Sequence, residues 1–137
     1  MLSRVADSLY WIALSHQRDQ WHVAALKLGE ALQRTAIVTT DEVLTEVLAF
    51  CSSDEGLRSD AAKIVRGILT GQAVRVMPQS HEGFLRGLVL YEARPDKGYS
   101  LTDCISMETM RQEGLTSVLT NDRHFEQEGF NALFRQM

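Results

Sequence analysis

Short apolar runs alternate with longer stretches of helical periodicity along the whole chain. Strands are predicted where apolar residues follow one another or alternate over a few positions, at 2–6, 36–40, 73–77, 117–120 and, at the edge of the sheet, 130–134. Helices are predicted where apolar residues recur every three or four positions, at 9–14, 19–34, 41–50, 57–69, 80–91 and 101–113. The run at 2–6 is the least regular of the strands, because Ser3 and Arg4 interrupt it.

The order of these elements predicts one α/β domain that spans residues 1–137. Strands separated by helices favour a central parallel sheet, here of four to five strands, flanked by helices on both faces. A length of 137 residues suits a single domain, and a hydrophobic content of 45% is enough to fill its core. No repeat, low-complexity segment or linker divides the chain.

Composition narrows the classes of function. The net charge of −4 argues against a protein that holds nucleic acid by bulk electrostatics alone, although it does not exclude a nuclease with an acidic site. Cys51 and Cys104 are isolated, so they indicate neither a zinc site nor a disulfide framework, and a reducing compartment is expected. No apolar run is long enough for a membrane span, so we expect a soluble, cytoplasmic protein without a membrane partner.

Acidic residues stand where predicted strands end or predicted helices begin. Asp7 follows the first strand, Asp122 follows the strand at 117–120, and Asp103 lies in the first turn of a helix. Glu46 or Glu42 adds a further acid from the helix after the second strand. Because open α/β folds place their sites at the carboxyl edge of the sheet, these acids are predicted to surround one pocket.

Each acid also has a simpler structural interpretation. Ser100 and Asp103 fit the spacing of a capping box, in which the acid bonds the backbone of the capping residue. Asp7 and Asp122 are each placed to cap the helix that follows them. The set of acids is stronger evidence for a site than any single one, because each adjoins a serine or threonine that can hydrogen-bond it.

Four segments carry a resemblance to a known family, namely Ala6-Asp7-Ser8, Thr40-x-x-Val-Leu-Thr-Glu46, Leu101-Thr-Asp-Cys-Ile-Ser106 and Leu119-Thr-Asn-Asp-Arg-His-Phe125. Together they resemble the PIN-domain ribonucleases and, in size and layout, the VapC-type toxins of toxin–antitoxin pairs. The similarity covers nearly the whole chain. The fold it implies is a single PIN-like nuclease domain over residues 1–137.

The resemblance implies a site and an activity. Asp7, Glu46, Asp103 and Asp122 match the acidic quartet of the family, as catalytic residues and metal ligands, and the supporting polar positions are matched by Ser8, Thr120 and Asn121. Oxygen ligands of this kind suit Mg²⁺ or Mn²⁺. The implied function is a metal-dependent endoribonuclease that cleaves single-stranded or looped RNA and is inhibited by a cognate antitoxin. The alternative is a PIN-like binding or scaffolding module without nuclease activity.

Other prominent residues are given surface, packing or interface roles. The four histidines, His16, His22, His81 and His124, show no metal-binding spacing. The helices at 9–14 and 43–50 carry more large apolar residues than one helical face needs. Some of that surface, including Trp11, is therefore expected to meet an antitoxin helix or a second copy of the chain in a homodimer.

Overall fold

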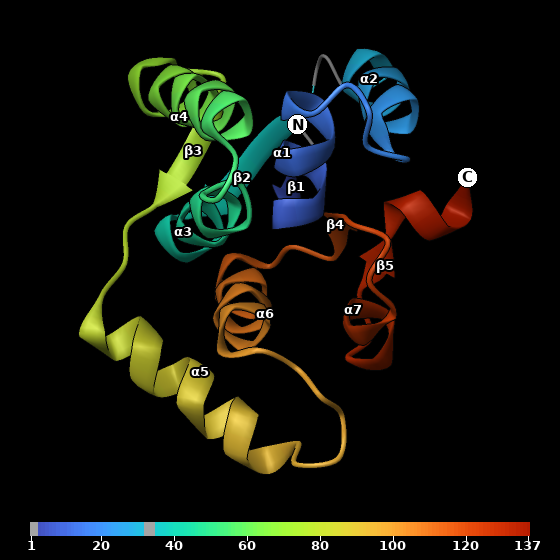
Figure 1. Cartoon of the computed structure of the whole chain (residues 1–137). Coiled ribbons are helices and arrows are strands. Elements are labelled where there is room, and N and C mark those ends of the chain that lie inside the picture. Colours follow the sequence, from blue (N-terminus) through green and yellow to red (C-terminus); the bar gives the residue numbers. More distant parts are fainter. Residues whose placement is uncertain (1–2, 32–34) are drawn as a thin grey trace.

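A five-stranded parallel sheet forms the centre of the molecule, which is a computed structural model describing residues 3–31 and 35–137 (Figure 1). The sheet has the strand order β3-β2-β1-β4-β5. Its strands are β1 (Ser3–Ala6), β2 (Ala36–Thr40), β3 (Val74–Met77), β4 (Ser117–Leu119) and β5 (Asn131–Ala132). This parallel sheet confirms the predicted α/β fold.

Helices cover both faces of the sheet, as predicted. They are α1 (Ser8–Ser15), α2 (His22–Ala31), α3 (Asp41–Phe50), α4 (Glu55–Thr70), α5 (His81–Ala93), α6 (Leu101–Glu113), α7 (Arg123–Gln127) and the 3-10 helix η1 (Leu133–Gln136). Consecutive strand residues point to opposite faces. Ala6 therefore packs with α1, α3 and α4, whereas Val5 packs with α6 and α7. Within the described residues, no helix has the length and apolarity that crossing a membrane requires.

The strand order places a switch point between β1 and β4. Val5 of β1 pairs with Val38 of β2 on one side and with Val118 of β4 on the other. The chain continues from β1 into α1 and from β4 into α7, so the two neighbouring strands lead into different helices. Ligand sites of open parallel sheets lie at such a point, beyond the carboxyl ends of the strands.

Helix ends follow local capping signals. The hydroxyl of Thr40 accepts a hydrogen bond from the backbone N–H of Val43 at 3.1 Å and so begins α3. Gly114 ends α6 with a φ of 67°, a left-handed conformation that favours glycine. Asp54 caps α4, which therefore begins two residues earlier than the periodicity predicts.

Two predicted elements differ from the structure. The helix predicted at 19–34 begins at His22, because the carboxylate of Asp19 accepts the backbone N–H of Trp21 at 2.8 Å and holds a turn there. Leu2 and positions 32–34 lie outside the described residues. The strand predicted at 130–134 pairs only over Asn131–Ala132 and then turns into η1, which brings Phe134 into the core beside Trp21.

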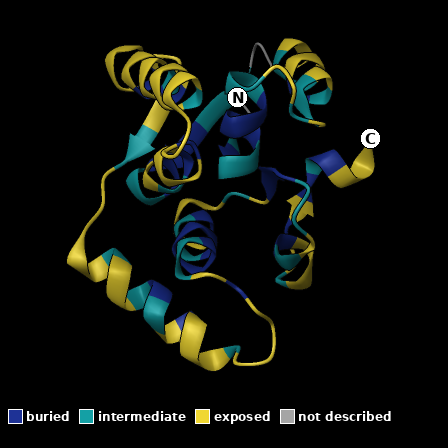
Figure 2. Cartoon of the chain, viewed as in Figure 1, coloured by how far each residue is buried: buried dark blue, intermediate teal, exposed yellow. Residues whose placement is uncertain are grey.

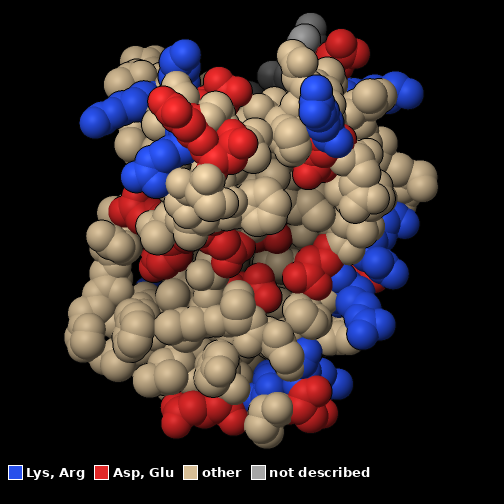
Figure 3. Space-filling view, viewed as in Figure 1, with Lys and Arg blue, Asp and Glu red and all other residues tan. Residues whose placement is uncertain are grey.

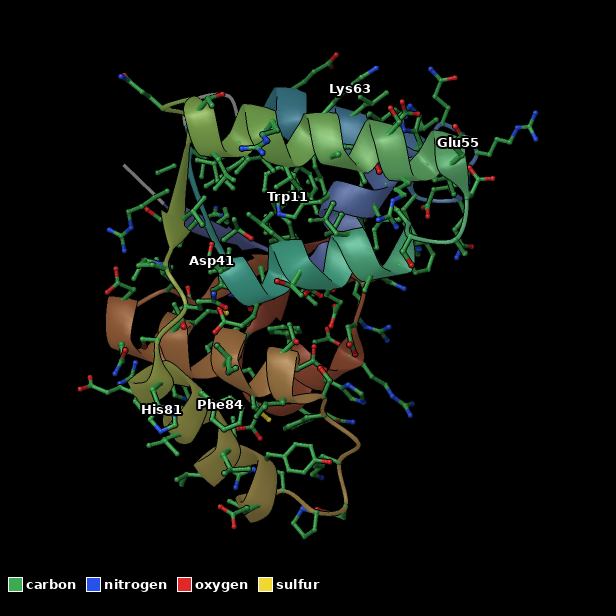
Figure 4. The ribbon with its side chains drawn as sticks, turned by 60° about the vertical axis from the view of Figure 1, so that its left-hand side comes forward. Trp11, Asp41, Glu55, Lys63, His81 and Phe84 are labelled. Atoms are coloured by element: carbon green, nitrogen blue, oxygen red, sulfur yellow. The ribbon has the colours of Figure 1, made fainter. Side chains whose placement is uncertain are left out.

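The interface predicted for Trp11 is wrong. Trp11 is 4% exposed and its indole N–H donates to the hydroxyl of Thr39 at 3.2 Å. Figure 4 shows its side chain inside the domain, between α3 and α4. The large apolar residues of α3 are also buried in this core, except for Leu48 and Phe50. The largest group of exposed apolar side chains lies instead on α5, most of which is exposed in Figure 2: Phe84, Leu85, Val89 and Tyr91.

Candidate active site

Asp7 stands at the carboxyl end of the central strand β1. It occupies the N-cap position of α1, yet its side chain makes no capping hydrogen bond. One carboxylate oxygen, Oδ2, accepts a hydrogen bond from the hydroxyl of Thr120 at 2.9 Å, and the other, Oδ1, is buried without a partner among the described residues. The simple capping interpretation therefore does not describe this carboxylate.

Thr120 also fixes the neighbouring acid. Its hydroxyl oxygen accepts the backbone N–H of Asp122 at 3.1 Å while its proton goes to Asp7. Asp122 in turn caps α7, because its Oδ1 accepts the backbone N–H of His124 at 2.9 Å. One buried hydroxyl after β4 thus relates the positions of two acids that are 115 residues apart in sequence (122 − 7).

Glu46 reaches the same place from α3. The hydroxyl of Ser8 donates a hydrogen bond to its Oε1 at 2.5 Å. Glu42, one turn earlier, lies in a different surface depression beside His81 and Phe84. The structure therefore decides between the two glutamates that the sequence left open.

Asp103 combines a capping role with a place in the site. Its backbone N–H donates to the Ser100 hydroxyl at 3.0 Å, and its Oδ2 accepts the backbone N–H of Ser100 at 3.1 Å. This is a complete capping box. Asp103 is nevertheless only 7% exposed and lines the pocket of the other acids, so it both caps α6 and belongs to the pocket.

The four acids line one pocket of about 310 Å³. The remaining lining residues are Ser8, Leu9, Ile12, Asp19, Gln20, Trp21, Phe50 and Thr120. None of the described residues that line it is a lysine or an arginine. Figure 3 shows acidic side chains gathered in the hollow across the middle of this face, with basic side chains towards its margins. A larger cavity of about 550 Å³, lined by residues such as His16 and Asp60, contains no member of the quartet.

Burial and repulsion from neighbouring charges raise the pKa values of two of these carboxyl groups, Asp7 and Asp103. Burial, and then the negative charge of Asp103, raise the pKa of Asp7 to about 7, against the opposing hydrogen bond from Thr120. Burial also raises the pKa of Asp103, with the charges of Asp122 and Glu46 adding to the effect. Without a cation, the pocket therefore holds less than its full negative charge at neutral pH.

The structure does not bring every predicted supporting residue into the pocket. Ser8 and Thr120 line it and bond its acids, but Asn121 is not among its described lining residues. The backbone carbonyl of Asn121 instead accepts a hydrogen bond from Arg135. Its supporting role stays a prediction that this geometry does not favour.

The sequence analysis missed two contributions. His124 was given a surface or packing role, but its Nδ1 lies 3.6 Å from Asp103 Oδ2 and 3.3 Å from Asp122 Oδ1. Trp21 and Phe50 also form part of the pocket wall, which the sequence analysis did not predict. The available signal for His124 was its place two residues after a predicted site acid, at the start of a helix.

Comparison with known proteins identifies the family. The sequence pattern of the PIN domain matches residues 5–131, so this chain belongs to the PIN-domain family. No curated protein matches the chain by sequence.

Solved structures share the fold. VapC20 from Mycobacterium tuberculosis, described as a sarcin–ricin loop cleaving toxin, superposes with a TM-score of 0.82 at 23% identity, covering 92% of this chain and 95% of that one. VapBC2 from Rickettsia felis, bound to a DNA fragment from its promoter, gives a TM-score of 0.66 at 13% identity, covering 96% and 97% of the two chains. Because both sequence identities are below 25%, these structural similarities establish only that the fold is shared.

Proposed function

We propose that this PIN-domain chain is a divalent-metal-dependent endoribonuclease and the toxin component of a toxin–antitoxin pair. The observation that carries the proposal is the pocket of four acids at the switch point of the sheet, which has no lysine or arginine among its described lining residues. A structural cluster of buried carboxylates would ordinarily be neutralised by basic side chains. A pocket that lacks them is suited to an external cation.

The donor atoms fit a divalent cation. Oδ1 of Asp7 is a buried oxygen without a partner among the described residues, and such an atom is costly unless something binds it. Burial and repulsion between carboxylates raise the pKa values of Asp7 and Asp103. A bound cation would offset both effects. Carboxylate oxygens are the preferred ligands of Mg²⁺ and are accepted by Mn²⁺.

The residues of the pocket have separable roles in this proposal. Asp7 and Asp103 hold the cation, Thr120 orients Asp7, and Ser8 orients Glu46, which assists directly or through water. Asp122 completes the site or positions the attacking water. A divalent ion bound here supplies an activated water and stabilises the charge that develops on the phosphodiester. Holding these acids in place before substrate arrives reduces the reorganisation that the reaction requires.

The neighbouring structures suggest which substrate and partner to test. Because VapC20 is described as cleaving the sarcin–ricin loop, an RNA stem-loop is the first substrate to try. The resemblance to VapC-type toxins, together with the fold shared with VapBC2, supports a cognate antitoxin for this chain. A homodimer, the alternative partner that the sequence analysis left open, stays a prediction.

Cleavage of a labelled RNA stem-loop with and without Mn²⁺ or Mg²⁺ tests this function. We expect metal-dependent cleavage that falls by about 10²-fold or more in Asp7→Asn, because the loss of one preorganised electrostatic group commonly costs this much. Asp96→Asn, the same change at an exposed loop position, is the matched control and should cleave normally. Cleavage that persists in Asp7→Asn or without metal would contradict the proposal. A folded protein that binds RNA without cleaving it would support the scaffolding alternative.

A further inference from the structure

His124 presents a ring nitrogen to two acids of the site without bonding either. The Nδ1 atom is inaccessible to solvent and has no hydrogen-bond partner among the described residues, although the side chain as a whole is 25% exposed. It lies 3.3 Å from Asp122 Oδ1 and 3.6 Å from Asp103 Oδ2, and neither contact has the geometry of a hydrogen bond. A buried polar atom without a hydrogen-bond partner is unusual in a folded protein, and it indicates that an ion or a water molecule binds there.

The ring is held in this place by its surroundings. The backbone N–H of His124 bonds the carboxylate of Asp122, which fixes the start of α7. The imidazole packs against Tyr99, with ring centroids 5.2 Å apart. Tyr99 is anchored in turn, since its hydroxyl donates to Glu128 at 2.9 Å. His124 is not one of the residues lining the open pocket; it approaches the two aspartates from the side of Tyr99.

Three donor atoms are thereby grouped as the ligands of one ion would be. One ligand atom each from Asp103, Asp122 and His124 lie within 4.8 Å of one another. Two ligands that meet at right angles on an ion at about 2.1 Å are about 3 Å apart. The observed separations of 3.3 and 3.6 Å are slightly longer, so a small inward movement would close the group around a cation.

We infer that His124 Nδ1 is a direct ligand of the cation that Asp7 and Asp103 hold, with Asp122 completing the ligand set beside it, and that it makes the site selective for Mn²⁺ over Mg²⁺. The inference rests on the proposed metal-dependent function. It changes the donor set from oxygen alone to oxygen and nitrogen. Both ions bind carboxylate and water oxygens, but Mn²⁺, as a transition-metal ion, also accepts an imidazole nitrogen, whereas Mg²⁺ is bound almost entirely through oxygen. The same nitrogen must then carry a lone pair, which leaves the proton on Nε2.

Pulsed electron paramagnetic resonance of the full chain loaded with Mn²⁺ alone tests this directly, because a bound ¹⁴N nucleus modulates the electron spin echo of the ion. We expect ¹⁴N modulation in the wild-type protein, and its replacement by ¹⁵N modulation when histidine is ¹⁵N-labelled. The modulation should disappear in His124→Asn and persist in His81→Asn, the same change on the exposed helix α5. In His124→Asn, Mn²⁺ affinity should fall by about 10-fold or more, while Mg²⁺ affinity changes much less.

Each other outcome has a distinct meaning. Mn²⁺ that binds with an affinity dependent on Asp103 but shows no histidine nitrogen would overturn the inference and leave the proposed function standing. Nitrogen modulation that survives in His124→Asn would also overturn it. Failure of the wild-type protein to bind Mn²⁺ or Mg²⁺ would remove both the inference and the metal-dependent function. The labelled wild-type spectrum decides the question even if the substituted protein does not fold.

Discussion

The two ends of the short helix α7 hold carboxylates under opposite electrostatic conditions. At its N-terminal end, Asp122 joins Asp7, Glu46 and Asp103 in a pocket without basic lining residues among those described. At its C-terminal end, the side chain of Glu128 is only 5% exposed, against 33% for Asp122, but it is surrounded by donors. The charge of Glu128 is neutralised by side chains of the domain, whereas the charges of the acidic pocket are not.

Glu128 has its charge satisfied from within the domain. Arg94 and Arg111 donate to its two oxygens at 2.9 and 2.7 Å, and the hydroxyl of Tyr99 adds a third bond at 2.9 Å. Burial works to raise the pKa of Glu128, but these bonds outweigh it and the pKa is lowered. Because the partners come from the loop after α5, from α6 and from the segment before α6, this cluster ties those parts to α7.

The contrast separates two electrostatic environments of carboxylates in this fold. In the Glu128 cluster the pKa falls and every strong charge has a partner, as expected of an ion-pair network that stabilises the fold. In the acidic pocket the pKa of Asp7 rises to about 7 and one of its oxygens stays unpaired. Strongly perturbed groups of this kind in a cleft are candidates for functional residues, because the protein retains them at a cost in stability.

The largest expected effect is an opposite dependence of stability on pH in the two regions. For Asp7, a folded-state pKa of about 7 against the usual 3.8 means that the folded protein binds the extra proton. The free energy of unfolding should therefore fall as pH rises from about 4 to about 7, by at most about 4 kcal/mol from this group. Glu128 has a lowered pKa, so its contribution is present above its usual value of 4.5 and is lost as pH falls.

Urea unfolding of metal-free protein from pH 5 to 8 measures this effect as a difference between wild type and Asp7→Asn. The variant should be the more stable of the two at pH 8, and the difference should shrink towards pH 5. If the stability difference between wild type and Asp7→Asn does not vary with pH, the pKa of Asp7 is not raised. The contrast between the acidic pocket and the Glu128 cluster would then fail.

A smaller loss of stability should follow neutralisation of Glu128. Glu128→Gln removes charge-assisted bonds to two arginines, so the free energy of unfolding should fall by about 1–3 kcal/mol at neutral pH. Glu126→Gln is the matched control on the same helix, because its pair with Arg135 is exposed and should contribute less than about 1 kcal/mol. Chemical denaturation of both variants checks this. Equal effects would mean that the Glu128 cluster is no more than a surface ion pair.

Local signals in the sequence predicted much of this architecture. The strand 36–40 and the helix after it were located correctly because Thr40 supplies the cap, and α6 was bounded by Ser100 and Gly114. The segment after Phe130 was only partly predicted, since packing of Phe134 against distant rings turns the chain into η1. Such long-range contacts leave no periodic trace in the sequence.

The candidate site was likewise predictable only in part. Strand ends and helix starts located Asp7, Asp103 and Asp122, because parallel strands bring their carboxyl ends to one edge. The choice of Glu46 over Glu42 depends on the rotation of α3, which the sequence does not specify. His124 was missed because its ring direction is set by Tyr99 and by the capping of α7, both of which are tertiary features.

Thermal unfolding of wild type and Asp103→Asn, each with and without Mn²⁺, tests the central claim that the acids form a cation site. Mn²⁺ at a hundredfold excess over its Kd should stabilise the wild type by about 2.7 kcal/mol. Asp103→Asn should be no less stable than wild type without metal, because it relieves repulsion while keeping the side-chain shape, and its metal-induced rise in Tm should shrink. A purely capping role predicts instead a loss of about 1 kcal/mol or less without metal and an unchanged response to Mn²⁺. That second result would contradict the account.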